Sequence, residues 1–552
     1  MTVNPTNQRV SADRKQHLGL VFAGLMLSML LASLSQMVLS TALPTMVGEL
    51  SGADHMMWVI TAYILASTIA MPIYGKLGDL LGRKNLLVAA IMIFVGGSII
   101  GGLAPDMNWL IAGRTIQGLG GGGLIILSQA VIADLVPARD RGKYMGIMGG
   151  VFAVSSVAGP LLGGWFTEDI GWRWTFWINL PLGALALAAT IFLLHLPPGS
   201  TKNPKLDFTG MALLSTATAS LVLVATWGGH TYAWTSPTIL ALMVLTAVAA
   251  LAFVRTETRA DEPIIPLHLF KERNFNLTTI SGLFVGIAMF GAMSYLPTYL
   301  QMATGASATV AGLLMVPMMG SMLIVSVISG MYVSRTGTYK WLPIAGSLAL
   351  ALAMVLLSTM TIDTPVWMIC SYIAVMGIGL GASMQILVLI VQNTFHVREV
   401  GTATAANNYF RQVGASLGSA VVGSVFAARL TTLLTERLPQ GGGATGGANS
   451  LTPDSVKQLP DALRLPIIES YNDALAPVFL YIAPLAITAA ILLCFLRVVP
   501  LATTIERDIP AESLAEGQLV VPPESDESEE SDQLGAVDAA ARAEAMATTE
   551  HR

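Results

Sequence analysis

Two arginines stand inside stretches of the sequence that are otherwise apolar or weakly polar. Arg114 is followed by Gln117 and a run of four glycines, and Arg411 follows the pair Asn407 and Asn408. A guanidinium keeps its charge and offers five hydrogen-bond donors. Burying one in an apolar helix costs about 3 kcal/mol on insertion scales, unless a partner or a polar cavity receives it. We therefore expect both arginines to face an acceptor or a polar path through the protein.

A charged segment follows the second long apolar stretch. The ten residues that begin at Gly75 read GKLGDLLGRK. Gly75, Gly78 and Gly82 favour a tight turn between closely packed helices, because glycine has no side chain to obstruct them. Asp79 could cap the N-terminus of a facing helix, and Arg83 could pair with carboxylates. Contacts of this kind would act as a gate if only one state of the protein made them.

Two motifs in these stretches resemble enzyme motifs but lack the residues that catalysis would need. Gly414, Ser416 and Gly418 match the G-x-S-x-G pattern of hydrolases, but that pattern needs a preceding strand and a histidine partner. The run Gly120–Gly123 is not followed by the Lys-Ser/Thr of a phosphate loop. We expect no enzymatic activity, no cofactor, no metal site and no use of ATP. A receptor that senses a small molecule without moving it remains a further interpretation.

The elements that must position these residues are long apolar helices. Of the 552 residues, 54% are hydrophobic and only 11% are charged, whereas soluble proteins carry about 25% charged residues. The apolar residues form blocks of about 20, the length of a helix that crosses ~30 Å of hydrocarbon. The sequence therefore predicts an all-α integral membrane protein with fourteen transmembrane helices. The blocks lie near residues 18–43, 55–75, 85–104, 109–133, 143–165, 174–194, 209–228, 237–254, 276–300, 308–332, 341–360, 366–392, 403–428 and 476–496.

Lysine and arginine are distributed unequally between the connecting loops. The loops on one side carry many of them, whereas the short loops on the other side hold Arg173 as their single base. Basic loops stay in the cytoplasm, so both termini should be cytoplasmic. The loop 429–475 is long enough to escape this rule. The segment 501–552 has 13 acidic and 3 basic residues and should be a disordered tail.

An internal repeat divides the chain. Gly330 and Gly337 follow the tenth block with the same spacing as Gly75 and Gly82 after the second. Two equivalent halves with a site between them are a transporter architecture. The predicted parts are a cytoplasmic N-terminal segment 1–17, a six-helix half 18–195, two inserted linker helices 196–272, a six-helix half 273–500 with the external loop 429–475, and the acidic tail 501–552.

At these motifs the sequence resembles the major facilitator superfamily, specifically its fourteen-helix drug:proton antiporter branch. The segment from Gly75 is similar to the signature G-x-L-x-D-x-x-G-R-K, and the segment from Arg114 is similar to R-x-x-Q-G on the fourth helix. The fifth helix resembles the antiporter motif G-P-x-x-G-G, and the segment WRWTFWINLPLG from Trp172 resembles a hallmark of the branch.

The resemblance implies a major facilitator fold, with two six-helix halves plus two inserted helices, and a monomer in a bacterial inner membrane. It further implies a secondary active exporter of small amphipathic or hydrophobic compounds, driven by protons through alternating access. Its partners would be the substrate, protons and the lipid bilayer, with no nucleic acid. The implied residues are Gly75, Asp79, Gly82, Arg83 and Lys84 for the gate, Arg114 and Gln117 for proton transfer, and Gly159, Pro160, Gly163 and Gly164 for the motif on helix five.

The chain departs from this family on the first helix. Relatives usually carry an aspartate where this sequence has Ser35, and no apolar block has an acid near its centre. A carboxylate at mid-membrane is the usual proton carrier and the usual anchor for a cationic drug. An alternative function is therefore export of lipid-like or anionic metabolites with weak or atypical proton coupling. The candidates for the cavity are Ser35, Gln36, Gln301, Gln385, Asn407 and Arg411.

Two interpretations of Arg114 stay open at this point. The residue could influence a nearby carboxylate, as the resemblance implies. It could also extend its side chain to the membrane surface, because Asn108 and Trp109 place that surface only a few residues away.

The loop charges lead to a test of topology. A single cysteine at position 202, introduced as Lys202→Cys in a chain without Cys370 and Cys494, should resist an impermeant thiol reagent in intact cells and react after lysis. A cysteine placed in the loop 429–475 is the matched control and should react in intact cells. Labelling of position 202 from outside would contradict the predicted orientation.

Overall fold

The computed structural model describes residues 5–50, 55–196, 206–229, 231–306, 308–437, 456 and 459–503. The extreme N-terminus, the glycine-rich centre of the loop 429–475 and the acidic tail beyond residue 503 lie outside the described residues. The described part belongs to one compact unit and, apart from an isolated bridge between Gly228 and Tyr232, its regular structure is helical.

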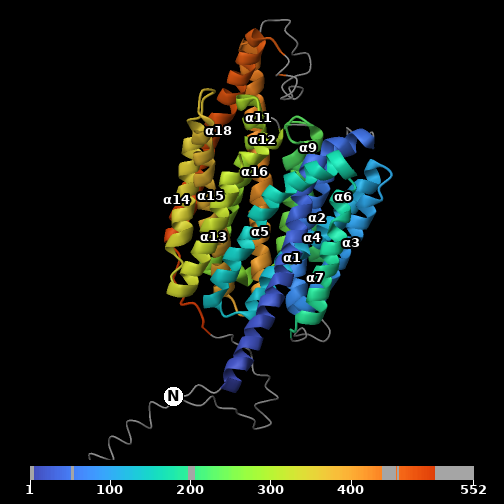
Figure 1. The fold of residues 1–552 in the computed structure, drawn as a ribbon, viewed down its shortest axis with the longest axis vertical. Helices are drawn as coiled ribbons and strands as arrows, with labels where there is room; N and C mark the ends of the chain where they lie inside the picture. Colours follow the sequence, from blue (N-terminus) through green and yellow to red (C-terminus); the bar gives the residue numbers. More distant parts are fainter. Residues whose placement is uncertain are drawn as a thin grey trace, which may run out of the picture. The chain divides into compact units, whose positions relative to one another are not determined.

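The helices follow one another along the chain in the order that the colours of Figure 1 show. They are α1 (Pro5–Glu49), α2 (Met56–Leu81), α3 (Arg83–Gly102), α4 (Met107–Leu135), α5 (Ala138–Trp165), η2 (Phe166–Ile170), α6 (Trp174–Trp177), α7 (Asn179–Leu193), α8 (Phe208–Trp227), α9 (Pro237–Glu257), η3 (Leu267–Lys271), α10 (Arg273–Met293), α11 (Leu296–Thr304), α12 (Ala308–Leu313), α13 (Val316–Thr336), α14 (Trp341–Ser358), α15 (Val366–Thr394), α16 (Val400–Arg437) and α18 (Asp461–Cys494).

Fourteen spans in the described part are long and apolar enough to cross a membrane, which confirms the predicted number. The ninth and tenth predicted blocks are each broken into two helices, α10 with α11 and α12 with α13. A proline lies within the first two residues of α11 and of α13, and its missing N–H is tolerated there but not in a helix interior. The helices α16 and α18 extend well beyond their apolar blocks into the long loop.

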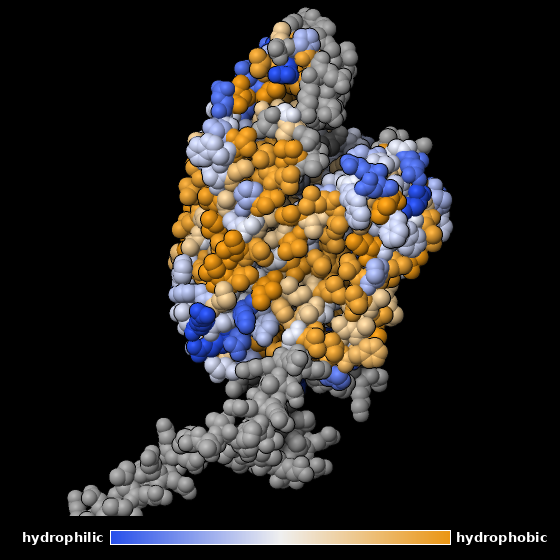
Figure 2. All heavy atoms as spheres, viewed as in Figure 1, coloured by the Kyte–Doolittle hydropathy of each residue, from blue (hydrophilic) through white to orange (hydrophobic). Residues whose placement is uncertain are grey.

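The helices form two groups, each with its own apolar core. Helices α1 to α7 enclose one core, which includes Leu31, Phe94 and Leu127. Helices α10 to α16 and α18 enclose another, which includes Leu350, Ile373 and Phe479. The inserted helices α8 and α9 pack on each other, and α8 also contacts α2 and α16. Apolar side chains cover much of the outer surface in Figure 2, as expected of a protein whose flanks face lipid.

The two groups meet through two equivalent helix pairs, α2 with α16 and α13 with α5. A Cβ on Gly75 would overlap Ala405 and the carbonyl of Gly401, and a Cβ on Gly330 would overlap the carbonyl of Gly142. The predicted repeat therefore has a structural counterpart: the second helix of each group packs a glycine against the fifth helix of the other group.

The prediction of a tight turn from Gly75 to Gly82 is wrong in its first part. Helix α2 continues through Gly75 and Gly78 to Leu81. Only Gly82, with φ of 94°, has the backbone conformation that reverses the chain. The first two glycines serve close packing instead, because Gly75 faces α16 and Gly78 faces Leu127 of α4.

The glycines of the motif on α5 differ in their surroundings. A Cβ on Gly159 would overlap Met37, and one on Gly163 would overlap Thr41 and the carbonyl of Val38, all on α1. Gly164 has open space around the position of its missing Cβ. Two of the three glycines thus bring α5 against α1 within the N-terminal group.

This difference leads to a test of the α1–α5 contact. Gly163→Leu should lower the Tm of the purified protein and reduce transport, because overpacking a tight helix contact costs about 1–3 kcal/mol. Gly164→Leu, the matched control one residue along, should change neither. Equal Tm and transport for the two variants would mean that the contact with α1 contributes neither to stability nor to transport.

Candidate functional site

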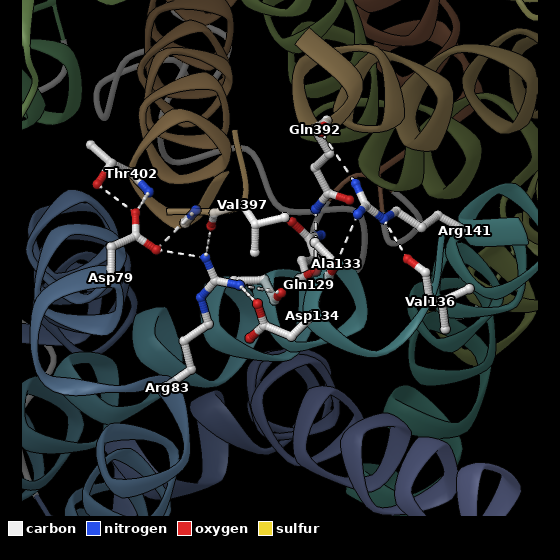
Figure 3. A network of polar contacts seen from close by, with 12 residues as sticks. Asp79, Arg83, Gln129, Ala133, Asp134, Val136, Arg141, Gln392, Val397 and Thr402 are labelled. Carbon is white, nitrogen blue, oxygen red and sulfur yellow. Dashed lines mark hydrogen bonds and ion pairs between the residues drawn. The ribbon is translucent and has the colours of Figure 1, made fainter. Parts of the chain in front are cut away.

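The carboxylate of Asp79 connects the two groups of helices at the end of the bundle where α2 turns into α3 (Figure 3). Its Oδ1 accepts the N–H of Gly401 at 3.2 Å, and its Oδ2 accepts the N–H and the hydroxyl of Thr402 at 2.7 and 2.8 Å. These N–H groups belong to the first turn of α16, where they have no partner within the helix. The aspartate therefore caps a helix of the opposite group, and the helix dipole favours its charge.

Arg83 extends this connection in three directions. Its Nη2 donates to Asp79 Oδ1 at 2.7 Å and to the carbonyl of Val397 at 2.9 Å. Its Nη1 donates to Asp134 Oδ1 at 2.5 Å and to the carbonyl of Ala130 at 2.9 Å. The side chain is 5% exposed. Arg83 thus ties α2 to α4 and to the turn between α15 and α16.

Arg141 forms a second buried connection that the sequence reasoning missed. Its guanidinium donates to the carbonyls of Val136 at 2.8 Å and Ala133 at 2.9 Å, and across the group boundary to the carbonyl of Gln392 at 3.2 Å. Gln392 in turn donates to the carbonyl of Gln129 at 3.2 Å. Arg141 precedes the predicted apolar block 143–165, so it counts among the basic loop residues, and nothing in the sequence marks it as buried.

The equivalent place in the second repeat is neutral. Ser334 lies four residues after Gly330, as Asp79 lies four residues after Gly75. Its hydroxyl accepts the N–H of Lys143 at 3.0 Å, in the second turn of α5, and donates to the carbonyl of Asp140 at 3.4 Å. The bundle end therefore has a contact across the group boundary in each repeat: Asp79 caps a helix with a charge, and Ser334 makes neutral hydrogen bonds to the side of one. We call the contacts of Asp79, Arg83, Arg141 and Ser334 across the group boundary the seal.

Two lysines near the seal have separate roles. Lys84 donates to the carbonyl of Ile191 at 2.9 Å, within the N-terminal group, so this predicted gate residue makes no described contact across the boundary. Lys76 pairs with Glu262 at 2.6 Å, which attaches α2 to the segment that follows the inserted helices.

Arg114 lies deep inside the N-terminal group. Its Nη1 donates to Gln117 Oε1 at 2.5 Å and to Ser35 Oγ at 3.4 Å, and its guanidinium stacks 4.2 Å above the ring centre of Tyr63. The side chain is 1% exposed, so the interpretation in which it reaches the membrane surface is wrong. Gln117 Nε2 in turn donates a hydrogen bond to Ser98 Oγ at 2.7 Å. None of these described partners is an acid.

The predicted cavity residues do not form one cluster. Ser35 contacts Arg114 in the N-terminal group, and Gln36 beside it is half-buried. Asn407 donates to Thr279 of α10 at 3.2 Å, which makes it a packing contact within the C-terminal group. Gln301 donates to the carbonyl four residues before it, at 3.4 Å. Gln385 and Arg411 lie on helices that contact the opposite group.

The tryptophan-rich hallmark forms a separate contact at the other end of the bundle. Glu49 accepts Trp172 Nε1 at 2.7 Å and Arg173 Nη1 at 2.5 Å. These hydrogen bonds, above all the one from Arg173, hold the pKa of Glu49 below its usual value. Glu49 therefore stays ionised near neutral pH and is a poor acceptor for a transported proton.

A bundle of fourteen membrane helices, whose two groups meet at a polar seal, defines a multi-pass membrane transporter. Comparison with known proteins agrees with this class. The model of the Major Facilitator Superfamily matches residues 25–419. An uncharacterised MFS-type transporter of Mycobacterium tuberculosis is 41% identical, with 90% of this chain and 72% of that protein covered. The multidrug transporter protein MdtP of Bacillus subtilis is 36% identical, with 83% and 89% covered.

Solved structures show the same fold. The human organic anion transporter MFSD10 (TETRAN) matches with a TM-score of 0.57 over 87% of this chain and 99% of its own, at 16% identity. That identity is low enough for the likeness to concern the fold alone. The chain belongs to the major facilitator superfamily, as the motifs predicted, and it is a transporter rather than an enzyme.

The seal leads to a test of Asp79. Asp79→Asn should fold, yet it should transport at least tenfold more slowly. An amide offers one oxygen where the carboxylate offers two, and each charge-assisted hydrogen bond contributes about 1.5–3 kcal/mol. The measurement is flux in proteoliposomes at matched protein density. Asp140→Asn, an exposed acid at the same end, is the control. Wild-type flux from well-folded Asp79→Asn would contradict a role for the seal.

Proposed function

We propose that this chain is a secondary active exporter of small amphipathic or hydrophobic compounds, which works by alternating access. The observation that carries this proposal is the seal. Charge-assisted hydrogen bonds join the two groups at one end through the terminal turns of α2 and α16. When two rigid groups of helices rotate relative to each other, the contacts between their helix ends can break together, while the apolar core of each group stays intact.

The orientation follows from the basic loops. We place the sealed end in the cytoplasm of a bacterial cell, with both termini on that side and the protein in the inner membrane as a monomer. The moving halves are residues 18–195 and 273–500, and residues 196–272 are a linker. In this orientation the structure corresponds to a state closed toward the cytoplasm and ready to release cargo outside.

Export rather than uptake is favoured by two observations. The glycine and proline motif of α5 resembles that of exporting branches, and Gly159 and Gly163 do lie against α1. MdtP is named a multidrug transporter, and its similarity extends over most of both chains. Both support drug-type cargo that enters from the cytoplasm or the inner leaflet.

We propose that the proton acts at the seal. Serine does not titrate in the physiological range, so Ser35 cannot carry a proton as the aspartate of relatives would. Arg83 is shared between Asp79 and Asp134, and Asp134 is the more exposed of the two at 18%. Protonation of Asp134 would remove one of the two acids that hold Arg83 and would loosen the seal.

The proposal is tested by flux of a fluorescent drug in proteoliposomes under an imposed pH gradient. An outward proton-driven flux is expected, and it should lose its pH dependence in Asp134→Asn. Absence of any gradient-driven flux for cationic, neutral and anionic amphiphiles would contradict the proposal.

A second variant tests the missing aspartate. Ser35→Asp should pair with Arg114, because Arg114 Nη1 lies only 3.4 Å from the serine oxygen. The new carboxylate should raise resistance to cationic drugs and alter the pH dependence of flux, whereas the neutral control Ser35→Asn should not. If wild type already exports dications with tight proton coupling and Ser35→Asp changes nothing, Ser35 has no bearing on coupling.

A further inference from the structure

A layer of polar side chains lies where α4, α15 and α16 meet, between the two halves and above the seal. We call it the polar layer, and its members are Gln129, Gln385, Gln392, Thr404, Asn408 and Arg411. Gln385 borders the layer on the side of α5, where it lies beside Gly149. Asn408 Nδ2 donates to Gln129 Oε1 at 3.0 Å across the boundary, and Gln392 Nε2 donates to the Gln129 carbonyl at 3.2 Å. The layer therefore includes hydrogen bonds between side chains of opposite halves.

The polar layer contains more hydrogen-bonding capacity than its members use. Four buried atoms have no hydrogen-bond partner among the described residues: Gln129 Nε2, Gln385 Oε1, Gln392 Oε1 and Thr404 Oγ1. Their side chains are 0 to 3% exposed. A buried polar atom without a partner costs about 1–3 kcal/mol. Such a concentration on facing helices is expected where a bound molecule or water completes the bonding.

Arg411 has fewer hydrogen-bond partners than Arg83 and Arg141, two other arginines at the boundary between the halves. Arg83 has two carboxylates, and Arg141 has three carbonyls. Arg411 Nη2 donates to Asn408 Oδ1, and no carboxylate in the described part of the chain pairs with it. A guanidinium has five N–H donors. Most of its donors and its whole charge are thus available to a ligand.

The position of Arg411 directs these donors between the halves. Thr404, Asn408, Arg411 and Ala415 recur at intervals of four, three and four residues, which places them on one face of α16. Part of that face meets α4, since Asn408 contacts Gln129, whereas the backbone of Arg411 and Ala415 lies against Gly286 of α10. Arg411 lies eleven residues from the start of α16 and Gln385 lies nine from the end of α15, so both sit about 14–17 Å from the sealed end.

The same face becomes apolar farther from the seal. Beyond Arg411 it carries Ala415, Val422 and Phe426, all buried. Val422 and Phe426 pack within the C-terminal core, and Val422 lies against Gly291 of α10. The polar part of this face is therefore confined to the turns nearest the seal. The charge at Arg411 is positive and has no compensating acid among the described residues.

We propose that the polar layer binds the head group of the cargo, and that the preferred cargo is an amphipathic organic anion, such as a carboxylate or sulfonate. Arg411 supplies the charge and two parallel donors, and Gln129 and Thr404 supply further donors. Gln385 and Gln392 accept hydrogen bonds from a hydroxyl or amide next to the anionic group. This assignment rests on the proposed export function and names the substrate class of that transporter.

The test uses three probes with one apolar body and different heads. They are 1-pyrenebutyrate, 1-pyrenebutanol and 1-pyrenebutyl-trimethylammonium. Binding to the full-length protein in phosphatidylcholine nanodiscs is measured by energy transfer from tryptophan to pyrene, with empty nanodiscs subtracted. The wild type should bind the anion about tenfold more tightly than the cation. Arg411→Gln should abolish this difference, and Arg411→Lys should keep part of it, because lysine retains the charge without the fork.

The controls separate this inference from the proposed function. Arg335→Gln removes one exposed positive charge outside the polar layer and should leave the preference unchanged. Equal or tighter binding of the cation by wild type would overturn the inference while export of amphiphiles stands. Binding of none of the three probes would contradict the export function and this inference together. If Arg411→Gln does not fold, the ratio of anion to cation affinity is compared between the wild type and Arg411→Lys, and a smaller ratio in Arg411→Lys is expected.

Discussion

The sharing of Arg83 between two acids is the interaction on which the arrangement of the halves depends. A cation and two carboxylates cannot be buried at the end of a membrane bundle unless each is paired. Here the pairing is completed only when the first turn of α16 lies against α2, since Asp79 needs the N–H groups of Gly401 and Thr402. The charge network therefore stabilises one relative position of the halves, and the glycines that allow the helices to approach are useful only in that position.

The second repeat shows how the same contact works without charge. Ser334 contacts α5 through two neutral hydrogen bonds, in the place where Asp79 caps α16 through three charge-assisted ones. Neutral hydrogen bonds contribute about half as much as charged ones. The charged cap can respond to a proton, whereas the serine cannot. The two-fold repeat thus supplies related contacts on both sides of the boundary, and their difference in charge places the proposed proton-sensitive part on the side of α2 and α4.

Arg83, Arg114 and Arg411 differ in how many partners their guanidinium groups have. Arg83 has two acids, Arg114 has an amide, a hydroxyl and an aromatic ring, and Arg411 has one amide. A buried cation without a partner costs free energy in a membrane protein. Such a residue is therefore expected to have a function that offsets this cost. The proposed seal and the proposed cargo site are therefore parts of one polar path between the halves, and Gln129 joins them through its contacts with Gln392 and Asn408.

The class of the protein, the number of spans and the kinds of partner found for Asp79 and Arg83 follow from the sequence alone. Apolar blocks of membrane length and a charged motif are local properties, so no knowledge of distant contacts is needed to find them. The sequence did not reveal that Gly75 and Gly78 remain helical, that Asn407 faces its own half, or that Arg141 crosses the boundary. These depend on which face of each helix meets a partner far away in the chain. Only the tertiary structure decides that, because a helix of mixed small and apolar residues has several faces that can pack equally well.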